Sequence, residues 1–196
     1  MGGKLSSAQT LPLILDFVNI VNKIDFNNKD FNNKEVNDDL TGETTIKYLK
    51  NVRKIAYILN SNHKSSLGLH PILYFYSQNG QHRTVSFLAV VDFVMKLNER
   101  KKLKDFIYVR ENFEDFLQNY DYLIKQIYEK HRDVQKSYKH ISNFFEQVVI
   151  HLKAGKTLDD TLNQITSSDD FKYLNIRNQE KSIPSSTKEF STNKKS

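Results

Sequence analysis

Residues 84–97, TVSFLAVVDFVMKL, form a clear helical pattern in this 196-residue chain. The helix starts at Thr84 or Ser86, and apolar side chains then recur every three or four residues, as on the buried face of an amphipathic helix. This face consists of Phe87, Leu88, Val91, Val94 and Met95. Ala89 lies among them, and its small side chain lets a neighbouring helix approach closely. The segment therefore predicts a helix packed in the core.

The same period recurs before and after this segment, over 11–24, 44–60, 113–127 and 138–152, with a shorter helix capped by Thr157. Thr10 is the expected N-cap of the first helix, and Gly155 is expected to end the helix over 138–152 in a left-handed conformation. The expected buried residues are Ile14, Phe17, Val18, Val21 and Ile24; Leu49, Val52, Ala56 and Leu59; Phe113, Phe116, Leu117, Tyr120, Leu123, Ile124 and Ile127; and Ile141, Phe144, Phe145, Val148, Val149 and Leu152. The pattern predicts a mainly α fold, a single-domain bundle of about six helices.

One apolar block within this bundle is ambiguous. Residues 72–76, ILYFY, are apolar on both faces, follow Pro71 and precede Asn79-Gly80. They fit either a short buried strand or a short helix opened by the proline, and periodicity does not separate the two. The helical segments on both sides favour the helix.

Composition divides the chain into a domain and its flanks. The helical domain is expected over 10–177, after a flexible N-terminus at 1–9. An Asn-rich stretch, in which DFNNK at 25–29 is repeated at 30–34, predicts an exposed loop over 25–43. Residues 178–196 are rich in Ser, Lys and Thr and are expected to be a disordered basic tail.

Composition also excludes several kinds of chemistry. The absence of cysteine excludes disulfide scaffolds, thiolate metal sites and cysteine nucleophiles. No glycine-rich phosphate loop is present, no two histidines have the spacing of a helical zinc site, and the acidic pairs are placed as helix caps. The sequence therefore predicts no catalytic residue, no cofactor and no metal ion. With no apolar run long enough for a membrane span and no signal segment, we expect no membrane contact and a cytoplasmic location.

Two groups of residues are candidates for anion binding. The net charge of +6 is compatible with a polyanionic partner but does not require one. Gln81, His82 and Arg83 follow a glycine turn at the start of a helix, where backbone N–H groups and a guanidinium can hold phosphate. The alternative is an ordinary Asn-Gly turn. The second group is Arg100, Lys101, Lys102 and Lys104, which mark a basic helix end or hinge.

The first group coincides with a family resemblance. Gly68-Leu69-His70-Pro71, Tyr74-Phe75-Tyr76-Ser77, Gly80 and Phe87-Leu88-Ala89 resemble a helical region of ParB-like, GmrS-type prokaryotic proteins that carry an Asp-Gly-Gln-Gln-Arg motif. The resemblance covers about residues 67–152. At 79–83 this chain has Asn-Gly-Gln-His-Arg, so the acidic residue and the second glutamine of the motif are not preserved. The resemblance implies an association with DNA restriction and phage defence.

Three functions follow from these observations. The first is a non-catalytic accessory module of a DNA-associated defence protein, in contact with the nucleic-acid backbone or with a catalytic partner protein. In this function Arg83 and the Arg100–Lys104 cluster contact phosphate. The second is a protein-interaction domain with no nucleic-acid role, supported by the apolar block from Leu69 to Tyr76. The third is a nucleotide-dependent nuclease fragment that uses the turn from Gly80 to Arg83.

Overall fold

The computed structural model describes residues 7–24, 39–77 and 79–176. These residues form eight α-helices and no strand: α1 (Ser7–Asn22), α2 (Glu43–Leu59), α3 (Pro71–Phe75), α4 (Thr84–Glu99), α5 (Leu103–Tyr120), α6 (Tyr122–His131), α7 (Val134–Lys153) and α8 (Leu158–Thr166). The mainly α fold class is therefore confirmed. The predictions for residues 1–6, 25–38 and 177–196 lie outside the described residues, and residues 7–9, predicted as part of a flexible terminus, are helical.

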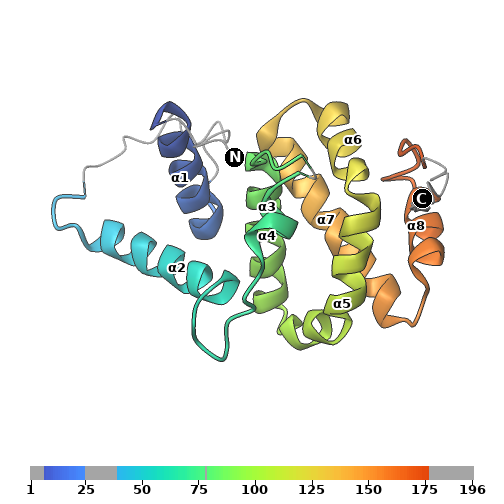
Figure 1. The fold of residues 1–196 in the computed structure, drawn as a ribbon. Helices are drawn as coiled ribbons and strands as arrows, with labels where there is room; N and C mark the ends of the chain where they lie inside the picture. Colours follow the sequence, from blue (N-terminus) through green and yellow to red (C-terminus); the bar gives the residue numbers. More distant parts are fainter. Residues whose placement is uncertain (1–6, 25–38, 78, 177–196) are drawn as a thin grey trace, which may run out of the picture.

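The helix α4 lies at the centre of the described fold. In Figure 1 the pair α1 and α2 flanks it on one side, and α5 to α8 lie on the other. Its side chains are buried almost throughout, from Val85 to Leu97, and its most extensive packing partner is α7. A helix that is apolar around most of its circumference is stable only when neighbours surround it. The sequence at 84–97 therefore places α4 in the core.

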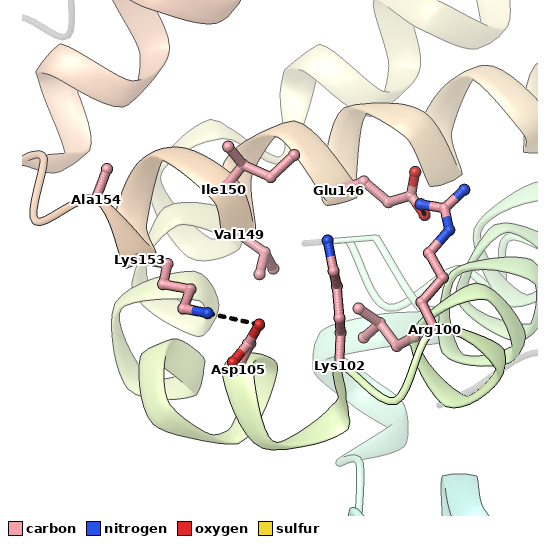
Figure 2. A pocket seen from close by; sticks show the side chains of 9 residues that line it. Arg100, Lys102, Asp105, Glu146, Val149, Ile150, Lys153 and Ala154 are labelled. Atoms are coloured by element: carbon pink, nitrogen blue, oxygen red, sulfur yellow. Dashed lines mark hydrogen bonds and ion pairs between the residues drawn. The ribbon is translucent and has the colours of Figure 1, made fainter.

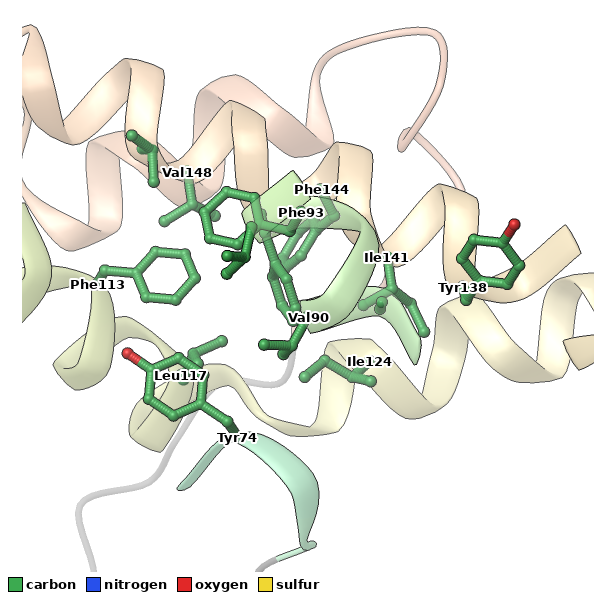
Figure 3. Packing of buried hydrophobic residues seen from close by; sticks show 14 of the residues in the cluster. Tyr74, Val90, Phe93, Phe113, Leu117, Ile124, Tyr138, Ile141, Phe144 and Val148 are labelled. Atoms are coloured by element: carbon green, nitrogen blue, oxygen red, sulfur yellow. The ribbon is translucent and has the colours of Figure 1, made fainter. Parts of the chain in front are cut away.

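Four phenylalanines form the centre of that core. Phe93 of α4 stacks on Phe113 of α5 with ring centroids 5.8 Å apart, and Phe106 and Phe145 contact both rings edge to face. All four side chains are at most 1% exposed. Figure 3 shows Phe93 and Phe113 among the buried residues of α4, α5 and α7. These aromatic contacts join the three helices that position the α4–α5 turn.

Residues 72–75 of the ambiguous block lie in the short helix α3, and Tyr76 follows it in an extended conformation. Pro71 is its first residue, where a missing N–H costs nothing. After it, Tyr76 pairs with His82 in a single antiparallel bridge, and the Arg83 N–H donates to the Phe75 carbonyl at 2.8 Å. The chain thus leaves α3, turns at Gly80 and enters α4.

The structure has two more helices than the six or so expected. One is α3, and the other arises because the predicted segment at 113–127 spans α5 and α6, which meet at Asp121. Its apolar period runs across the junction because both helices pack against α7. The first helix also begins earlier than predicted, at Ser7 and not after Thr10.

The predicted buried faces of the two outer helices are partly wrong. Ile14 of α1 and Leu49 of α2 are about half exposed, whereas Ile55 and Leu59 are the buried residues of α2. Both helices carry apolar residues on more than one side, so periodicity alone does not identify the side that faces α4. At the other end, Phe171 and Leu174 are buried, so packing continues past Asp170, where the sequence pattern fades.

The predicted helix caps are largely confirmed. Thr157 accepts a hydrogen bond from the Asp160 N–H at 3.1 Å, and Gly155 has a φ of +78°. Asp39 accepts from the Thr45 N–H at 2.7 Å, and this backbone hydrogen bond is the main reason that the pKa of Asp39 is lowered. Asp39 therefore caps the start of α2, as its position predicts. The prediction is wrong for Asp169 and Asp170, which follow the end of α8.

Candidate nucleic-acid interface

The turn that contains Gln81 and His82 is held by its own backbone. The Ser77 N–H donates to the Gln81 carbonyl at 2.9 Å, and the Gln81 N–H donates to the Ser77 hydroxyl at 3.2 Å. The His82 ring meets Tyr76 edge to face, and burial lowers the pKa of His82, which favours the neutral imidazole. Gln81 is exposed. Two of the three candidate side chains at this turn are thus uncharged.

Arg83, the third candidate, has partners inside the protein. Its guanidinium forms an ion pair with Asp121 and donates to the Tyr76 carbonyl at 3.0 Å. The Arg83 and Asp121 side chains are only 18% and 17% exposed. The guanidinium therefore joins the start of α4 to the junction of α5 and α6.

The surroundings of this turn add no free positive charge. A cavity of about 700 Å³ beside Gly80 is lined by Glu114 and Asp121. Glu114 accepts from the Arg110 guanidinium at 2.6 Å and from the Tyr74 hydroxyl at 2.8 Å. The carboxylates are thus balanced by the arginines that they bind. The anion site predicted at Gln81, His82 and Arg83 stays a prediction, with no supporting contact.

The second candidate group forms the turn between α4 and α5. Lys101 has a φ of +57°, its N–H donates to the Asn98 carbonyl at 3.1 Å, and the Lys102 N–H donates to the Leu97 carbonyl at 2.7 Å. This pair of bonds is a Schellman motif, in which glycine usually occupies the position of Lys101. The structure thus brings Arg100, Lys101 and Lys102 together on one tight turn, and Lys104 follows in the first turn of α5.

This turn borders a cavity of about 360 Å³ between α4, α5 and α7. Its walls include the apolar side chains of Leu97, Val149, Ile150 and Ala154, and five charged residues line it as well. Figure 2 shows the Lys102 amine reaching over this cavity, between Val149 and Glu146. Lys102 is therefore part of a charged rim around apolar walls.

The charged residues around this cavity differ in their partners. Arg100 pairs with Glu146 at 3.0 Å, and Lys153 pairs with Asp105 at 2.6 Å. Among the described residues, Lys101, Lys102 and Lys104 form no ion pair, and all three are exposed. Three of the four predicted cations therefore present uncompensated charge to solvent.

A second basic surface runs along α2. Lys47, Lys50, Arg53 and Lys54 are exposed and form no ion pair within the described part of the chain. In Figure 1, α2 and the α4–α5 turn both lie towards the lower edge of the molecule. The spacing of these four cations places them on one side of α2.

The three cations Lys50, Arg53 and Lys54 border a groove of about 460 Å³. Tyr57, Ile58 and Ser65 complete its lining, which contains no carboxylate. Tyr57 follows Arg53 by four residues and Lys54 by three, so its position beside them could be read from helical spacing. Ser65 comes from the loop after α2, and no local pattern signals its contribution.

The remaining candidates for chemistry have structural partners. Asp159 accepts from the Tyr120 hydroxyl at 2.6 Å, and burial followed by this hydrogen bond raises the pKa of Tyr120 to about 12. No group of three metal-ligating side chains occurs in the described ranges. His131 and His140 stack with ring centroids 3.8 Å apart, a pairing that sequence spacing did not predict. The ring of Tyr138, between Lys136 and Lys139 in the sequence, is buried and not available for stacking with a base.

The chain matches no protein-family model, no curated protein and no solved structure. No helix among the described residues has the length and apolarity required to cross a membrane.

Proposed function

We propose that this chain is a non-catalytic helical module that binds the phosphate backbone of nucleic acid. Its contacts are the three lysines of the α4–α5 turn, Lys101, Lys102 and Lys104, together with the basic side of α2. Backbone contacts of this kind supply affinity and orientation without reading base sequence.

One observation carries this proposal: these lysines lack carboxylate partners, while their neighbours have them. Arg100 and Lys153 pair with Glu146 and Asp105, so the available acidic groups at this cavity are already used. A lysine without a carboxylate partner contributes more free energy to phosphate binding, because no existing ion pair must be broken. The counterions that such phosphates release on binding add to the affinity.

The resemblance of residues 67–152 to ParB-like, GmrS-type proteins extends the proposal to a cellular role. The chain would serve as an accessory module of a DNA-associated prokaryotic defence protein, beside a partner that carries the catalytic residues. Arg83, which pairs with Asp121, is left out of the binding surface.

The test measures duplex DNA binding at several salt concentrations. The variant K101Q/K102Q/K104Q removes three charges from the α4–α5 turn. We expect about tenfold weaker DNA binding at low salt. The slope of log K against log salt concentration should become less steep by about 2.7, which is about 0.9 for each lost phosphate contact. Absent or salt-insensitive binding by the unaltered protein would contradict the proposal.

A matched control separates the position of the charge from its amount. The variant K125Q/K130Q/K172Q removes the same three charges from lysines that are already engaged. Lys125 pairs with Glu129, Lys172 pairs with Asp169, and Lys130 lies over the ring of Tyr173. This variant should bind within about twofold of the unaltered protein, since its lysines make no phosphate contact.

The alternative of a protein-interaction domain draws on two apolar surfaces. In the expected block, Leu69 and Tyr74 are buried, and Ile72 is 66% exposed. Leu11, Ile14 and Leu15 of α1 are also each at least 50% exposed and have the spacing of one helix face. Light scattering after size exclusion tests this function: a monomer that stays unchanged with L11S/L15S would count against self-association through α1.

A further inference from the structure

The groove on α2 differs from the α4–α5 turn because it contains an aromatic ring among its cations. Tyr57 is 50% exposed, and the groove beside it is bordered by Lys50, Arg53 and Lys54. These three cations form no ion pair in the described ranges, and none of the groove's lining residues is acidic. Its chemistry is therefore a π surface surrounded by positive charge.

The wall of this groove is a loop that is fixed to α2 by hydrogen bonds. The Leu67 N–H donates to the Ile58 carbonyl at 2.7 Å, and the Leu69 N–H donates to the Leu59 carbonyl at 2.9 Å. The Ser66 hydroxyl accepts from the Ser61 N–H at 2.9 Å. These bonds hold the loop from Ser61 to Leu67 against the end of the helix, so the groove is present before a ligand binds.

Further contacts of this loop reach the core and the Tyr57 ring. The Arg110 guanidinium of α5 donates to the Leu67 carbonyl and, at 3.3 Å, to the Gly68 carbonyl. Within the loop, the His63 Nδ1 and Ser65 hydroxyl lie 2.7 Å apart, and the His63 ring lies 6.2 Å from the Tyr57 ring. The loop therefore limits the space around Tyr57 on one side and leaves half of its surface open.

We propose that this groove binds single-stranded nucleic acid, with a base stacked on Tyr57 and the flanking phosphates held by Lys50, Arg53 and Lys54. This inference rests on the proposed function and names its preferred substrate. Base stacking on an aromatic side chain, within a basic groove that follows the backbone, is the general means of binding single strands without sequence preference. In a duplex both faces of each base are already covered by neighbouring bases, so Tyr57 has no surface to stack on.

Tyr128 is an exposed tyrosine that lacks this combination. Tyr128 is 40% exposed on α6, but its neighbour Glu129 is acidic and pairs with Lys125. Tyr128 is absent from the residues that line the described cavities. It therefore provides a matched control for loss of an exposed ring.

The experiment compares the affinity of the full chain for a labelled 20-nucleotide oligothymidine and for a 20-base-pair duplex at one salt concentration. The Tyr57→Leu variant should bind the single strand about tenfold more weakly, and the duplex within about twofold, because only the single strand loses a stacked base. Tyr57→Phe should retain the affinity, and Tyr128→Leu should leave both affinities unchanged. Circular dichroism confirms that each variant is folded.

Photo-crosslinking provides a second measurement. An oligonucleotide with 5-iodouracil should crosslink to the tryptic peptide that runs from Ile55 to Lys64 and contains Tyr57. A crosslink that occurs only elsewhere would overturn the assignment of the groove.

The outcomes distinguish this inference from the proposed function. Unchanged single-strand binding by Tyr57→Leu, or equal weakening for both substrates, overturns the groove while duplex binding through the α4–α5 turn still stands. A further outcome is that an acidic peptide displaces the oligonucleotide and itself binds about tenfold more weakly to Tyr57→Leu. That result assigns the groove to a protein partner and also overturns the inference. No binding of either nucleic acid overturns both proposals.

Discussion

Arg83 pairs with Asp121 across 38 positions of sequence and joins the start of α4 to the α5–α6 junction. The same guanidinium donates to the Tyr76 carbonyl, so it also holds the turn that precedes α4. An arginine that was predicted as a phosphate ligand thus makes a contact typical of a structural residue. If Arg83 is a structural residue, its replacement should lower stability. If it is a phosphate ligand, its replacement should weaken nucleic-acid binding.

The first prediction is that Arg83 contributes to stability and not to nucleic-acid binding. Asp121→Leu leaves a mostly buried guanidinium without its partner and should lower the free energy of unfolding by about 2 kcal/mol. Arg83→Met with Asp121→Leu should lose less than the sum of the two single variants, since the cost of the unpaired charge is removed. Urea denaturation measures all three. DNA binding by Arg83→Met, measured while the variant is folded, should change less than about twofold, since no phosphate contact is removed.

A tenfold loss of binding by Arg83→Met would instead support the anion site at the turn. It would show that the ion pair between Arg83 and Asp121 breaks when phosphate binds to Arg83. The variant therefore also tests the expectation drawn from residues 79–83.

The second prediction concerns the phenylalanine cluster. Phe113 contacts Phe93, Phe106 and Phe145 and is completely buried. Phe113→Leu should lower the free energy of unfolding by about 1–2 kcal/mol and Phe113→Ala by about 4 kcal/mol, because the removed ring leaves a cavity. Ile107→Ala, at an exposed position of the same helix, should cost less than about 0.5 kcal/mol in the same denaturation measurement. Equal losses for Phe113→Ala and Ile107→Ala would contradict this packing.

The core was predictable from sequence because its helices have one apolar side or are apolar throughout. For α7, the expected residues from Ile141 to Leu152 are all buried. The prediction was only partly right for α1 and α2, whose apolar residues occupy more than one side: Val21 and Leu59 are buried as expected, but Ile14 and Leu49 are exposed. In α2 both Leu49 and Ile55 fit a buried helix face, and only the contact with α4 distinguishes them.

The candidate site was predictable only where its residues are neighbours in sequence. Arg100, Lys101, Lys102 and Lys104 share a turn, so their proximity follows from the chain itself. Which of them are unpaired depends on Glu146, which follows 46 residues after Arg100. The groove at Tyr57 combines a helix with the loop after it, and the fold of that loop depends on hydrogen bonds that no spacing indicates.

The third prediction concerns the left-handed position of Lys101. A lysine at a φ of +57° is less stable than glycine there, because its Cβ crowds the backbone. Lys101→Gly should raise the free energy of unfolding by about 0.5 kcal/mol while it weakens DNA binding, since one phosphate contact is lost. Stability and affinity are thus expected to change in opposite directions.

Arg132 is the matched control for this variant. It ends α6 with a φ of +50°, and it is exposed at a site with no part in the proposed interface. Arg132→Gly should raise the free energy of unfolding by a similar amount and leave the affinity for DNA unchanged. Equal weakening of binding by both variants would show that net charge, and not the α4–α5 turn, determines the affinity.

The fourth prediction follows from the stacked imidazoles of His131 and His140. Burial, and then the nearby charges of His140, Lys130 and Lys136, lower the pKa of His131. A histidine whose pKa is lower in the folded state binds protons more readily when the chain is unfolded. Stability from this group is therefore complete above the unfolded pKa of about 6.5 and falls as the pH decreases below it.

His131→Phe should keep a flat ring against His140 and remove this titration. It also replaces the His131 Nε2, a buried atom without a hydrogen-bond partner, so the variant should be at least as stable as the unaltered protein at pH 7.5. Between pH 7.5 and 5.5 its free energy of unfolding should fall less steeply. A smaller decline should remain, because burial also lowers the pKa values of His82 and His151. Identical declines in the two proteins would show that the stacked pair does not bind protons differently on folding.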